Sequence, residues 1–359
     1  MTKRLARLRE TVADTDREIL ALLNRRAEIS REIGKAKEET GKSVYDPARE
    51  RDVFRRIREE NPGPLDGPAV EAVFREIVSA CRALQAPLRV AFLGPEGSFS
   101  HGAALLRFGS GAVPVPRQSI FHVFDAAERE QADFAVVPAE NSLEGAVNLT
   151  LDRLVSTNLN LAGEVLLPVH HHLLARDPSL EGLKRVYSHP QALAQCQMWL
   201  RKHLPTCGWI ETASTAEGAR KAREDREGAA LGSEKAAEIH GLCVVRERVE
   251  DHPANVTRFL VLGRLEAAPT GNDKTSILFG TRHVPGALRR ALEPFAEERV
   301  NLLKILSHPW RDRIWEYLFF ADFAGHREDE KIGRCLASLE REVPFLKILG
   351  SYPAAEERP

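Results

Sequence analysis

The chain has 359 residues, enough for two or three domains, and 43% of them are hydrophobic and 29% charged. A formal net charge of −1 gives no electrostatic reason to expect nucleic acid or a membrane surface as a partner. No apolar run approaches the roughly 20 residues that span a bilayer, and the charged N-terminal segment is unlike a signal peptide. The five cysteines are scattered without a CxxC pair, which is typical of reduced thiols in a cytoplasmic protein.

Residues 1–86 are predicted to form an all-α domain. The first helix, of about 38 residues and about 57 Å, carries apolar residues at seven-residue spacing, beginning with Leu5 and Leu8. After the break in "TGKSVYDPARERD", Asp46 is a good N-cap for a second helix, and a third helix follows "NPGPLDGP". Two short helices cannot cover the apolar face of the first helix, so the pattern predicts an intertwined dimer.

Arg26 interrupts the apolar seam of the first helix, at a position where Leu or Ile would be the stable choice. Lys37, 11 residues later, points within about 20° of it. Other polar side chains are expected to face the same interior, namely Asp46, Arg49, Glu50 and Gln85. The pattern fits a pocket for an anion, and it also fits a structural arginine–glutamate network that sets the dimer register.

The stretch "LRE…LLNRRAEISREIGKAK…VYDPARERD" resembles the all-helical chorismate mutases over residues 1–86. The rearrangement of chorismate is pericyclic, so the resemblance implies no cofactor and a site that clamps a compact conformer. Lys37 and Gln85 would stabilise negative charge on the breaking ether oxygen. Arg9 lies about 100° around the helix from Arg26 and is expected to serve the partner chain's pocket. The full set implied to bind chorismate is Arg9, Arg26, Lys37, Asp46, Arg49, Glu50, Cys81 and Gln85, with Cys81 standing where many members have Ser.

Residues 88–264 alternate predicted strands with amphipathic helices, as in an α/β domain. Several strands end in small polar residues that would open a helix, and these N-termini would offer N–H groups to a carboxylate in one crevice. The residues at these junctions are Ser98, Ser100, Asn141, Ser142, Ser188 and Ser233. Neither a dinucleotide fingerprint nor a P-loop is present. The pattern also fits a periplasmic-type binding lobe without catalytic activity.

"GPEGSFSH", "PAENSLEGAVNLTLD", "SHPQAL" and "DHPANVTRFLVLG" closely resemble prephenate dehydratase, which implies a two-lobed domain like a periplasmic binding protein. That enzyme removes CO2 and the ring hydroxyl from prephenate and gives phenylpyruvate. Its essential threonine, here Thr257, would hydrogen-bond the leaving hydroxyl or relay a proton to it. Arg258 would hold a carboxylate or form a structural salt bridge. The other residues implied to line the crevice are Ser98, Asn141, Ser142, Ser188, Gln191 and Phe259.

The triplet His170, His171 and His172 invites a metal interpretation. It falls in the strand predicted over residues 159–175, where neighbours point to opposite faces, and no Cys/His spacing supports a metal site. We therefore expect neither a metal nor a cofactor.

Residues 274–352 follow the linker "RLEAAPTGND" and show the βαββαβ order of an α+β ferredoxin-like domain. This segment resembles the ACT regulatory domain, which binds phenylalanine at a dimer interface. The positions of its ligand motifs are held by Gly286, Ala287, Leu288, Asn301, Leu306 and His308. Leu306 and His308 depart from the usual Glu and Arg, and Arg289 stands where an apolar residue is usual.

The three resemblances together imply a cytoplasmic bifunctional chorismate mutase–prephenate dehydratase, a homodimer or higher homo-oligomer that phenylalanine regulates. Its partners would be chorismate, prephenate and phenylalanine, with no nucleic acid and no membrane. Two alternatives remain at this point. The chain could be a dehydratase whose helical and ACT segments only dimerise or sense, or it could be a binding protein, which the "NVTRF" motif disfavours.

Overall fold

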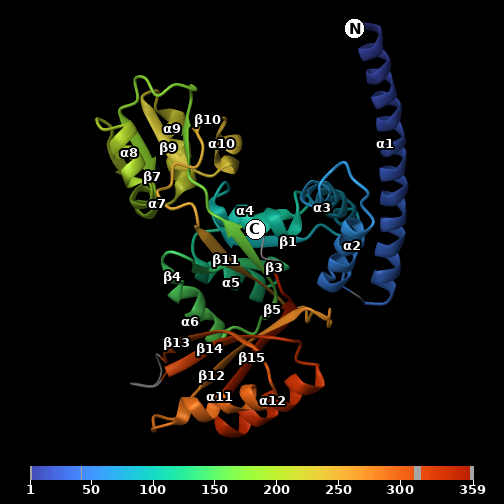
Figure 1. Ribbon diagram of the computed structural model, residues 1–359, viewed down its shortest axis with the longest axis vertical. Coiled ribbons are helices and arrows are strands. Elements are labelled where there is room, and N and C mark those ends of the chain that lie inside the picture. The colour runs from blue at the N-terminus through green and yellow to red at the C-terminus, as the bar shows by residue number, and fades with distance from the viewer. Residues whose placement is uncertain (1, 42, 311–316, 356–359) are drawn as a thin grey trace. The chain divides into compact units, whose positions relative to one another are not determined.

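The computed structural model describes residues 2–41, 43–310 and 317–355. The chain divides into two compact units, and Figure 1 labels their helices and strands. The first unit holds the chain up to Leu88 together with the segment Phe108–Val113, and the second holds Arg89–Arg107 and the chain from Pro114 onwards. Among the described residues, no helix is long and apolar enough to cross a membrane.

The first unit is built on three helices, α1 (Thr2–Glu39), α2 (Pro47–Glu59) and α3 (Gly67–Ala83). The predicted length of the first helix, 38 residues, is confirmed. Asp46 accepts a hydrogen bond from the backbone N–H of Arg49 at 3.0 Å, so it caps α2 as predicted. Asp66 caps α3 in the same way, through the N–H of Ala69 at 2.8 Å.

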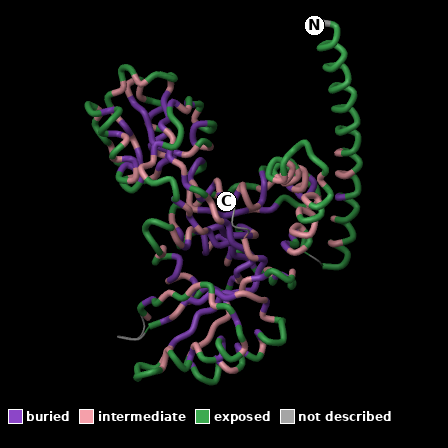
Figure 2. Tube along the Cα trace, viewed as in Figure 1, coloured by how far each residue is buried: buried purple, intermediate pink, exposed green. Residues whose placement is uncertain are grey.

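The apolar seam of α1 is exposed in the single chain, as the green helix in Figure 2 shows. The exposed fraction of its side chains runs from 46% for Ile33 to 64% for Leu22. The residues of this seam are Leu5, Leu8, Val12, Ile19, Leu22, Ile29 and Ile33. The two shorter helices therefore leave most of the apolar face of α1 in contact with solvent.

The central α/β domain contains two sheets, which form two lobes. The first sheet has the order β2-β1-β3-β11-β5, with β4 paired to β3, and the second has the order β10-β6-β9-β7-β8. The strands of the first sheet are β1 (Arg89–Leu93), β2 (Val113–Arg117), β3 (Phe134–Asn141), β4 (Gly145–Ala146), β5 (Asn160–Pro168) and β11 (Val256–Gly263). Those of the second are β6 (His172–Ala175), β7 (Arg185–Ser188), β8 (Gly208–Glu211), β9 (Gly228–Gly232) and β10 (Cys243–Arg246). The predicted two-lobed α/β fold is confirmed.

Seven helices accompany these strands along the chain. Between strands of the first sheet lie α4 (Phe99–Phe108), α5 (Ile120–Glu128) and α6 (Asn148–Ser156). Between strands of the second lie α7 (Pro190–Gln195), α8 (Gln197–His203), α9 (Thr215–Glu224) and α10 (Glu234–His240). Two predicted helix starts are correct, because Ser98 accepts a hydrogen bond from an N–H of α4 and Ser233 accepts one from α10.

Three local predictions for this domain are wrong. The single strand expected over residues 159–175 is two strands of different sheets, so His170 and His171 lie in the break where the chain crosses between the lobes. Asn141 and Ser142 do not open a helix, because β3 turns back into β4 before α6 begins. His189, rather than Ser188, occupies the N-cap of α7.

The C-terminal domain has the predicted ferredoxin-like order, with antiparallel strands arranged β13-β14-β12-β15. Its elements are β12 (Asp273–Gly280), α11 (Ala287–Glu297), β13 (Leu302–Pro309), β14 (Tyr317–Ala324), α12 (Glu330–Glu342) and β15 (Phe345–Pro353). Residues 314–316 of the third predicted strand lie outside the described residues. Both helices pack on one face of the sheet through a cluster that includes Phe295, Ile332 and Leu336.

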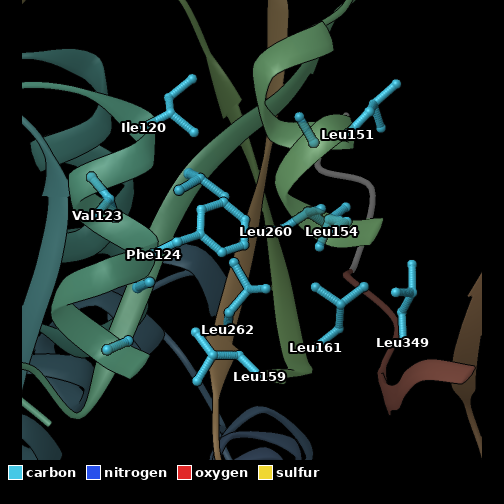
Figure 3. Close-up of a cluster of buried hydrophobic side chains, with 14 of the residues drawn as sticks. Ile120, Val123, Phe124, Leu151, Leu154, Leu159, Leu161, Leu260, Leu262 and Leu349 are labelled. Atoms are coloured by element: carbon cyan, nitrogen blue, oxygen red, sulfur yellow. The ribbon is translucent and has the colours of Figure 1, made fainter. Parts of the chain in front are cut away.

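The other face of this sheet belongs to the core of the central domain. One cluster of buried side chains runs from Phe124 of α5 and Leu154 of α6, through Leu260 of β11, to Leu349 of β15 (Figure 3). Gly350 lies so close to the backbone of Leu161 that a Cβ atom there would overlap it. The first lobe of the central domain and this face of the C-terminal sheet therefore share one packed core cluster.

Candidate active sites

A cavity with a volume of about 1030 Å³ lies between the two lobes of the central domain. Both lobes contribute to its wall, the first through the ends of β1, β3 and β11 and the second through α7 and α9. Six residues singled out from the sequence line it, namely Ser98, Ser100, Asn141, Gln191, Thr257 and Phe259. A volume of this size accommodates a small organic ligand.

Thr257 and Asn141 face each other on adjacent antiparallel strands, in register on β11 and β3. The Asn141 Nδ2 atom donates to Thr257 Oγ1 at 2.9 Å. The amide is held in this orientation because its Oδ1 atom accepts the backbone N–H groups of Leu143 and Glu144. Since Thr257 Oγ1 accepts from the amide, its own hydroxyl proton can be donated to a ligand in the cavity.

A chain of amide hydrogen bonds continues from Asn141 along the cavity wall. Asn141 Nδ2 also donates to Asn255 Oδ1 at 2.7 Å, and Asn255 Nδ2 donates to Gln195 Oε1 at 3.0 Å. Gln195 Nε2 then donates to the carboxylate of Glu144 at 2.9 Å. Every amide in the chain points the same way, which polarises the bonds cooperatively. Asn255, Gln195 and Glu144 line the cavity, and the sequence analysis did not single them out.

His171 is hydrogen-bonded to the same series of amides and also lines the cavity. Its Nε2 atom lies 3.0 Å from Gln195 Oε1, which is an acceptor, so the ring proton is on Nε2. Its Nδ1 atom is buried and has no hydrogen-bond partner among the described residues. Burial lowers the pKa of His171, against the opposing effects of Gln195 and Glu250. The ring is therefore a neutral imidazole that donates to Gln195.

The three consecutive histidines have different partners. His170 Nδ1 lies 2.8 Å from Glu250 Oε1, whereas His171 contacts Gln195 and His172 begins β6. In the described parts of the chain, no group of three or more His, Cys, Asp or Glu residues is arranged to hold a metal ion.

Two of the predicted crevice residues support the wall from outside the cavity. Ser142 Oγ donates to the carbonyl of Ala254 at 3.1 Å and accepts the N–H of Val256 at 3.0 Å, which ties the turn after β3 to the start of β11. Ser188 is fully buried and donates to the carbonyl of Leu231 at 2.8 Å. Both serines hold backbone in place.

Arg258 leaves β11 on the face opposite Thr257, away from the cavity. Its Nε atom lies 2.7 Å from Glu164, Nη1 lies 2.5 Å from Asp322, and Nη2 lies 3.0 Å from the hydroxyl of Tyr352. Burial opposes the charge, but Tyr352, Asp322 and Glu164 outweigh it and raise the pKa of Arg258. Of the two roles left open by the sequence, this geometry fits the structural salt bridge and does not fit a hold on a substrate carboxylate.

Two predicted site residues of the helical domain, Arg26 and Gln85, lie along the contact between α1 and the segment that contains α3. Arg26 Nη1 lies 3.5 Å from the carbonyl of Ile77, and a Cβ atom on Gly34 would lie 3.0 Å from the side chain of Gln85. These two contacts are eight residues apart in both helices, so α1 and α3 run in the same direction there. Lys37, one turn beyond Gly34, donates to the carbonyl of Val44 at 2.8 Å.

The Oε1 atom of Gln85 is buried and has no hydrogen-bond partner among the described residues. Cys81, one turn earlier on α3, is also buried. Asp46 and Arg49 are exposed at the start of α2, and Glu50 forms an ion pair with Arg82. Arg9 is exposed and lies about 25 Å along α1 from Arg26, so it cannot reach the same pocket within one chain.

The predicted regulatory residues fall in two groups. Gly286 has a φ of 76°, the left-handed conformation that glycine favours, and it precedes Ala287 at the start of α11. On β13, Leu306 and His308 face the central domain, where His308 Nε2 lies 2.8 Å from Asp152 of α6. Leu288 packs against the core beneath α11, and Asn301 is exposed just before β13.

Three family models match this chain in consecutive stretches. Chorismate mutase type II matches residues 8–86, prephenate dehydratase matches residues 90–267, and the ACT domain matches residues 275–341.

Individual relatives cover most of the chain. The bifunctional chorismate mutase/prephenate dehydratase of Aquifex aeolicus (strain VF5) is 43% identical over 355 residues, 98% of each chain. Arogenate dehydratase/prephenate dehydratase 2, chloroplastic, of Arabidopsis thaliana is 40% identical over 282 residues, covering 74% of this chain and 73% of its own. The solved structure of prephenate dehydratase in complex with L-Phe from Arthrobacter aurescens superposes with a TM-score of 0.69 at 35% identity, over 76% of this chain and 92% of its own.

Proposed function

Because this chain belongs to the family of bifunctional chorismate mutase/prephenate dehydratases, we propose a division of its two reactions among its domains. The protein converts chorismate to prephenate and prephenate to phenylpyruvate, on the route to phenylalanine. Residues 1–86 carry the mutase, residues 88–264 the dehydratase, and residues 274–352 the regulatory ACT domain. Matches to both enzyme families set aside the dehydratase-only and binding-protein alternatives.

In the mutase site, Arg26 holds a carboxylate of chorismate, and Lys37 and Gln85 face the ether oxygen whose bond breaks. The reaction forms one carbon–carbon bond as it breaks this carbon–oxygen bond, so the site supplies only a clamp and stabilisation of charge. Support comes from the position of Gln85 against Gly34, which precedes Lys37 by about one turn of α1. Asp46, Arg49, Glu50 and Cys81 complete the set that we assign to this site.

The mutase works as a homodimer in which Arg9 of one chain enters the pocket of the other. Two observations support this arrangement. The apolar seam of α1 is uncovered in the single chain, and burial of such a face is favourable at roughly 25 cal/mol per Å². Arg9 is too far along α1 to reach the pocket of its own chain.

In the dehydratase site, Thr257 acts on the ring hydroxyl of prephenate. The electron pair of the bond to the departing carboxylate moves into the ring, CO2 leaves, and the hydroxyl leaves as water once it has gained a proton. The hydrogen bond from Asn141 to Thr257 Oγ1 supports a donor role for the threonine hydroxyl, either as a hydrogen bond or as a proton relay. This single contact carries the assignment.

His171 supports the same site through Gln195. Its neutral imidazole donates from Nε2 to Gln195 Oε1, the atom that also accepts from Asn255. The side chains of Ser98, Gln191 and Phe259 complete the wall that we assign to prephenate.

Phenylalanine binds the C-terminal domain and inhibits the dehydratase, through the turn at Gly286–Leu288 and the strand after Asn301. The relative from Arthrobacter aurescens was solved in complex with L-Phe, which supports this assignment. Leu306 and His308 shape the response through their contact with the central domain.

We further infer a cytoplasmic protein, since all five cysteines are free thiols.

Two rates measured separately test these assignments. In one reaction the purified protein is given chorismate, and the loss of chorismate is followed. In a second reaction the protein is given prephenate, and the formation of phenylpyruvate is measured. We expect Thr257→Ala to remove only the second activity, with Thr206→Ala, an exposed threonine, as the matched control. An unchanged dehydratase rate in Thr257→Ala would overturn the site.

A further inference from the structure

Arg82 is a buried arginine of α3 that none of the assignments above uses. Only 6% of the residue is exposed. One guanidinium nitrogen forms an ion pair with Glu50 on α2, and another donates to the carbonyl of Phe108. The guanidinium also lies 5.4 Å from the ring centre of Tyr45 and 6.0 Å from that of Phe108.

The segment Phe108–Val113, which packs with the helices of the first unit, is the anchor for Arg82. Ser79 Oγ donates to the carbonyl of Phe108 at 2.7 Å and accepts the N–H of Gly111 at 2.9 Å. Gly111 fits because a Cβ atom there would lie only 2.8 Å from the carbonyl oxygen of Ser79. The segment is therefore closely fitted to α3, and the carbonyl that Arg82 contacts is held in place.

Glu50 lies in the first turn of α2, next to Arg49, and its side chain is 18% exposed. A carboxylate at such a position can swing toward water unless a partner holds it. Arg82 is a partner with a fixed position, because its second contact is to the backbone of an adjacent segment. The planar guanidinium has several N–H donors in fixed directions, so it can hold a carboxylate and a carbonyl at the same time. An ammonium group has its donors on a single nitrogen atom.

We propose that Arg82 is a positioning residue of the mutase, which holds the Glu50 carboxylate in its binding orientation and rests on the segment Phe108–Val113. The proposal depends on the assignment of Glu50 to the chorismate site made above. It implies that residues beyond the mutase domain of the sequence help to complete the mutase site.

The test uses the full chain with Arg82→Met, which keeps an apolar side chain against Tyr45 and Phe108 but cannot bind Glu50. We expect the KM for chorismate to rise roughly tenfold, with a smaller change in kcat, because an oriented binding group is lost from ground and transition states alike. Arg82→Lys should recover part of the loss. The matched control is Arg75→Met, on the same helix, whose arginine contacts Glu71 at 3.0 Å and should leave both constants unchanged.

Glu50→Gln separates the proposal from the assignment on which it depends. If Glu50→Gln leaves mutase kinetics unchanged, the assignment of Glu50 to the site fails, and the proposal fails with it. If Glu50→Gln impairs the mutase and Arg82→Met does not, only the proposal is overturned. Adding Arg82→Met to Glu50→Gln should cause no further rise in KM, and additive losses would contradict it. Should Arg82→Met fail to fold, Arg82→Lys decides, with an expected rise of about threefold and no rise as the contrary result.

Discussion

In the cleft between the lobes, Thr257 and Asn141 are already hydrogen-bonded to each other, and an amide chain fixes their orientation as far as Glu144. In the helical domain, by contrast, a buried oxygen of Gln85 has no hydrogen-bond partner in the described part of the chain, and Arg9 lies far from Arg26. We infer from this difference that the strand register of a single chain completes the proposed dehydratase site. The proposed mutase site, in contrast, would need a second copy of the chain before its ligand groups meet.

The largest effect should come from the threonine of the cleft. Thr257→Ala should lower the dehydratase rate about a thousandfold, because the group that hydrogen-bonds or protonates the leaving hydroxyl is lost. Thr257→Ser should keep part of the rate, since it retains the hydroxyl. The measurement is phenylpyruvate formation from supplied prephenate, with chorismate loss as the internal control. Equal rates for the Ala and Ser variants would contradict the role of the hydroxyl.

Arg26→Ala should have the next largest effect, this time on the mutase alone. Loss of a part-buried charge-assisted contact costs about 3–5 kcal/mol, or at least a hundredfold in rate. The neighbouring Arg25 is exposed, so Arg25→Ala is the matched control and should leave the mutase rate unchanged. Chorismate loss and dehydratase turnover are measured on the same preparation. A parallel fall of both activities in a folded Arg26→Ala protein would show that the two sites are not separate.

Mixing variants should show whether the mutase site is shared between chains. Arg9→Ala and Arg26→Ala proteins, each inactive as a mutase, should regain activity when they are unfolded and refolded together. Half of the dimers would be mixed, and each would hold one intact site, so about a quarter of the sites should be active. Dehydratase activity should not depend on mixing. No recovery despite proven mixed dimers would contradict a mutase site shared between chains.

The smallest effect concerns pH. Burial lowers the pKa of His171 in the folded protein. In the unfolded chain the pKa of a histidine is about 6.5, so just below that pH the ring binds a proton when the chain is unfolded and stays neutral when it is folded. The stability that this ring contributes is therefore present above about pH 6.5 and falls as the pH drops below that value. Other groups facing the ring are His170, His172 and Glu250, and Gln195 connects it to Glu144.

The dehydratase rate should fall several-fold as the pH is lowered from about 7 to 5, because protonation would place a charge and an unpartnered Nδ1–H beside the hydrogen bonds of Gln195 and Asn255. His171→Asn keeps a donor and an acceptor without titrating, so its rate should be lower but less dependent on pH. The mutase, measured in parallel, reports any general loss of structure. The histidine assignment would be wrong if both proteins showed the same pH profile.

Much of the fold was predictable because its signals are local. Asp46 begins a helix through a cap, and the order of strands and helices predicted both the α/β domain and the ferredoxin-like domain. The two lobes of the α/β domain were expected only from the resemblance to prephenate dehydratase. The two roles left open for Arg258 could have been separated by the same kind of signal. Adjacent strand residues point to opposite faces, so Thr257 and Arg258 could not both face the cleft.

The amide chain was not predictable, because its members come from separate elements. Asn255 precedes β11, Gln195 ends α7, and Glu144 lies in the turn before β4, and no spacing in the sequence relates them. His171 was considered only as a metal ligand. Its place in the break between β5 and β6 depends on the crossing between two sheets, which is a tertiary feature that periodicity does not report.

The core shared by the central and C-terminal domains has a consequence for how these domains unfold. Leu349 of β15 packs with Leu161 and Leu260 of the first lobe, so neither side can separate without exposing the other. Amide protons of β5, β11 and β15 should consequently exchange with solvent in one cooperative event, despite the linker that divides them in sequence. Proteolytic cleavage of residues 265–272 would leave two fragments that stay bound and unfold together.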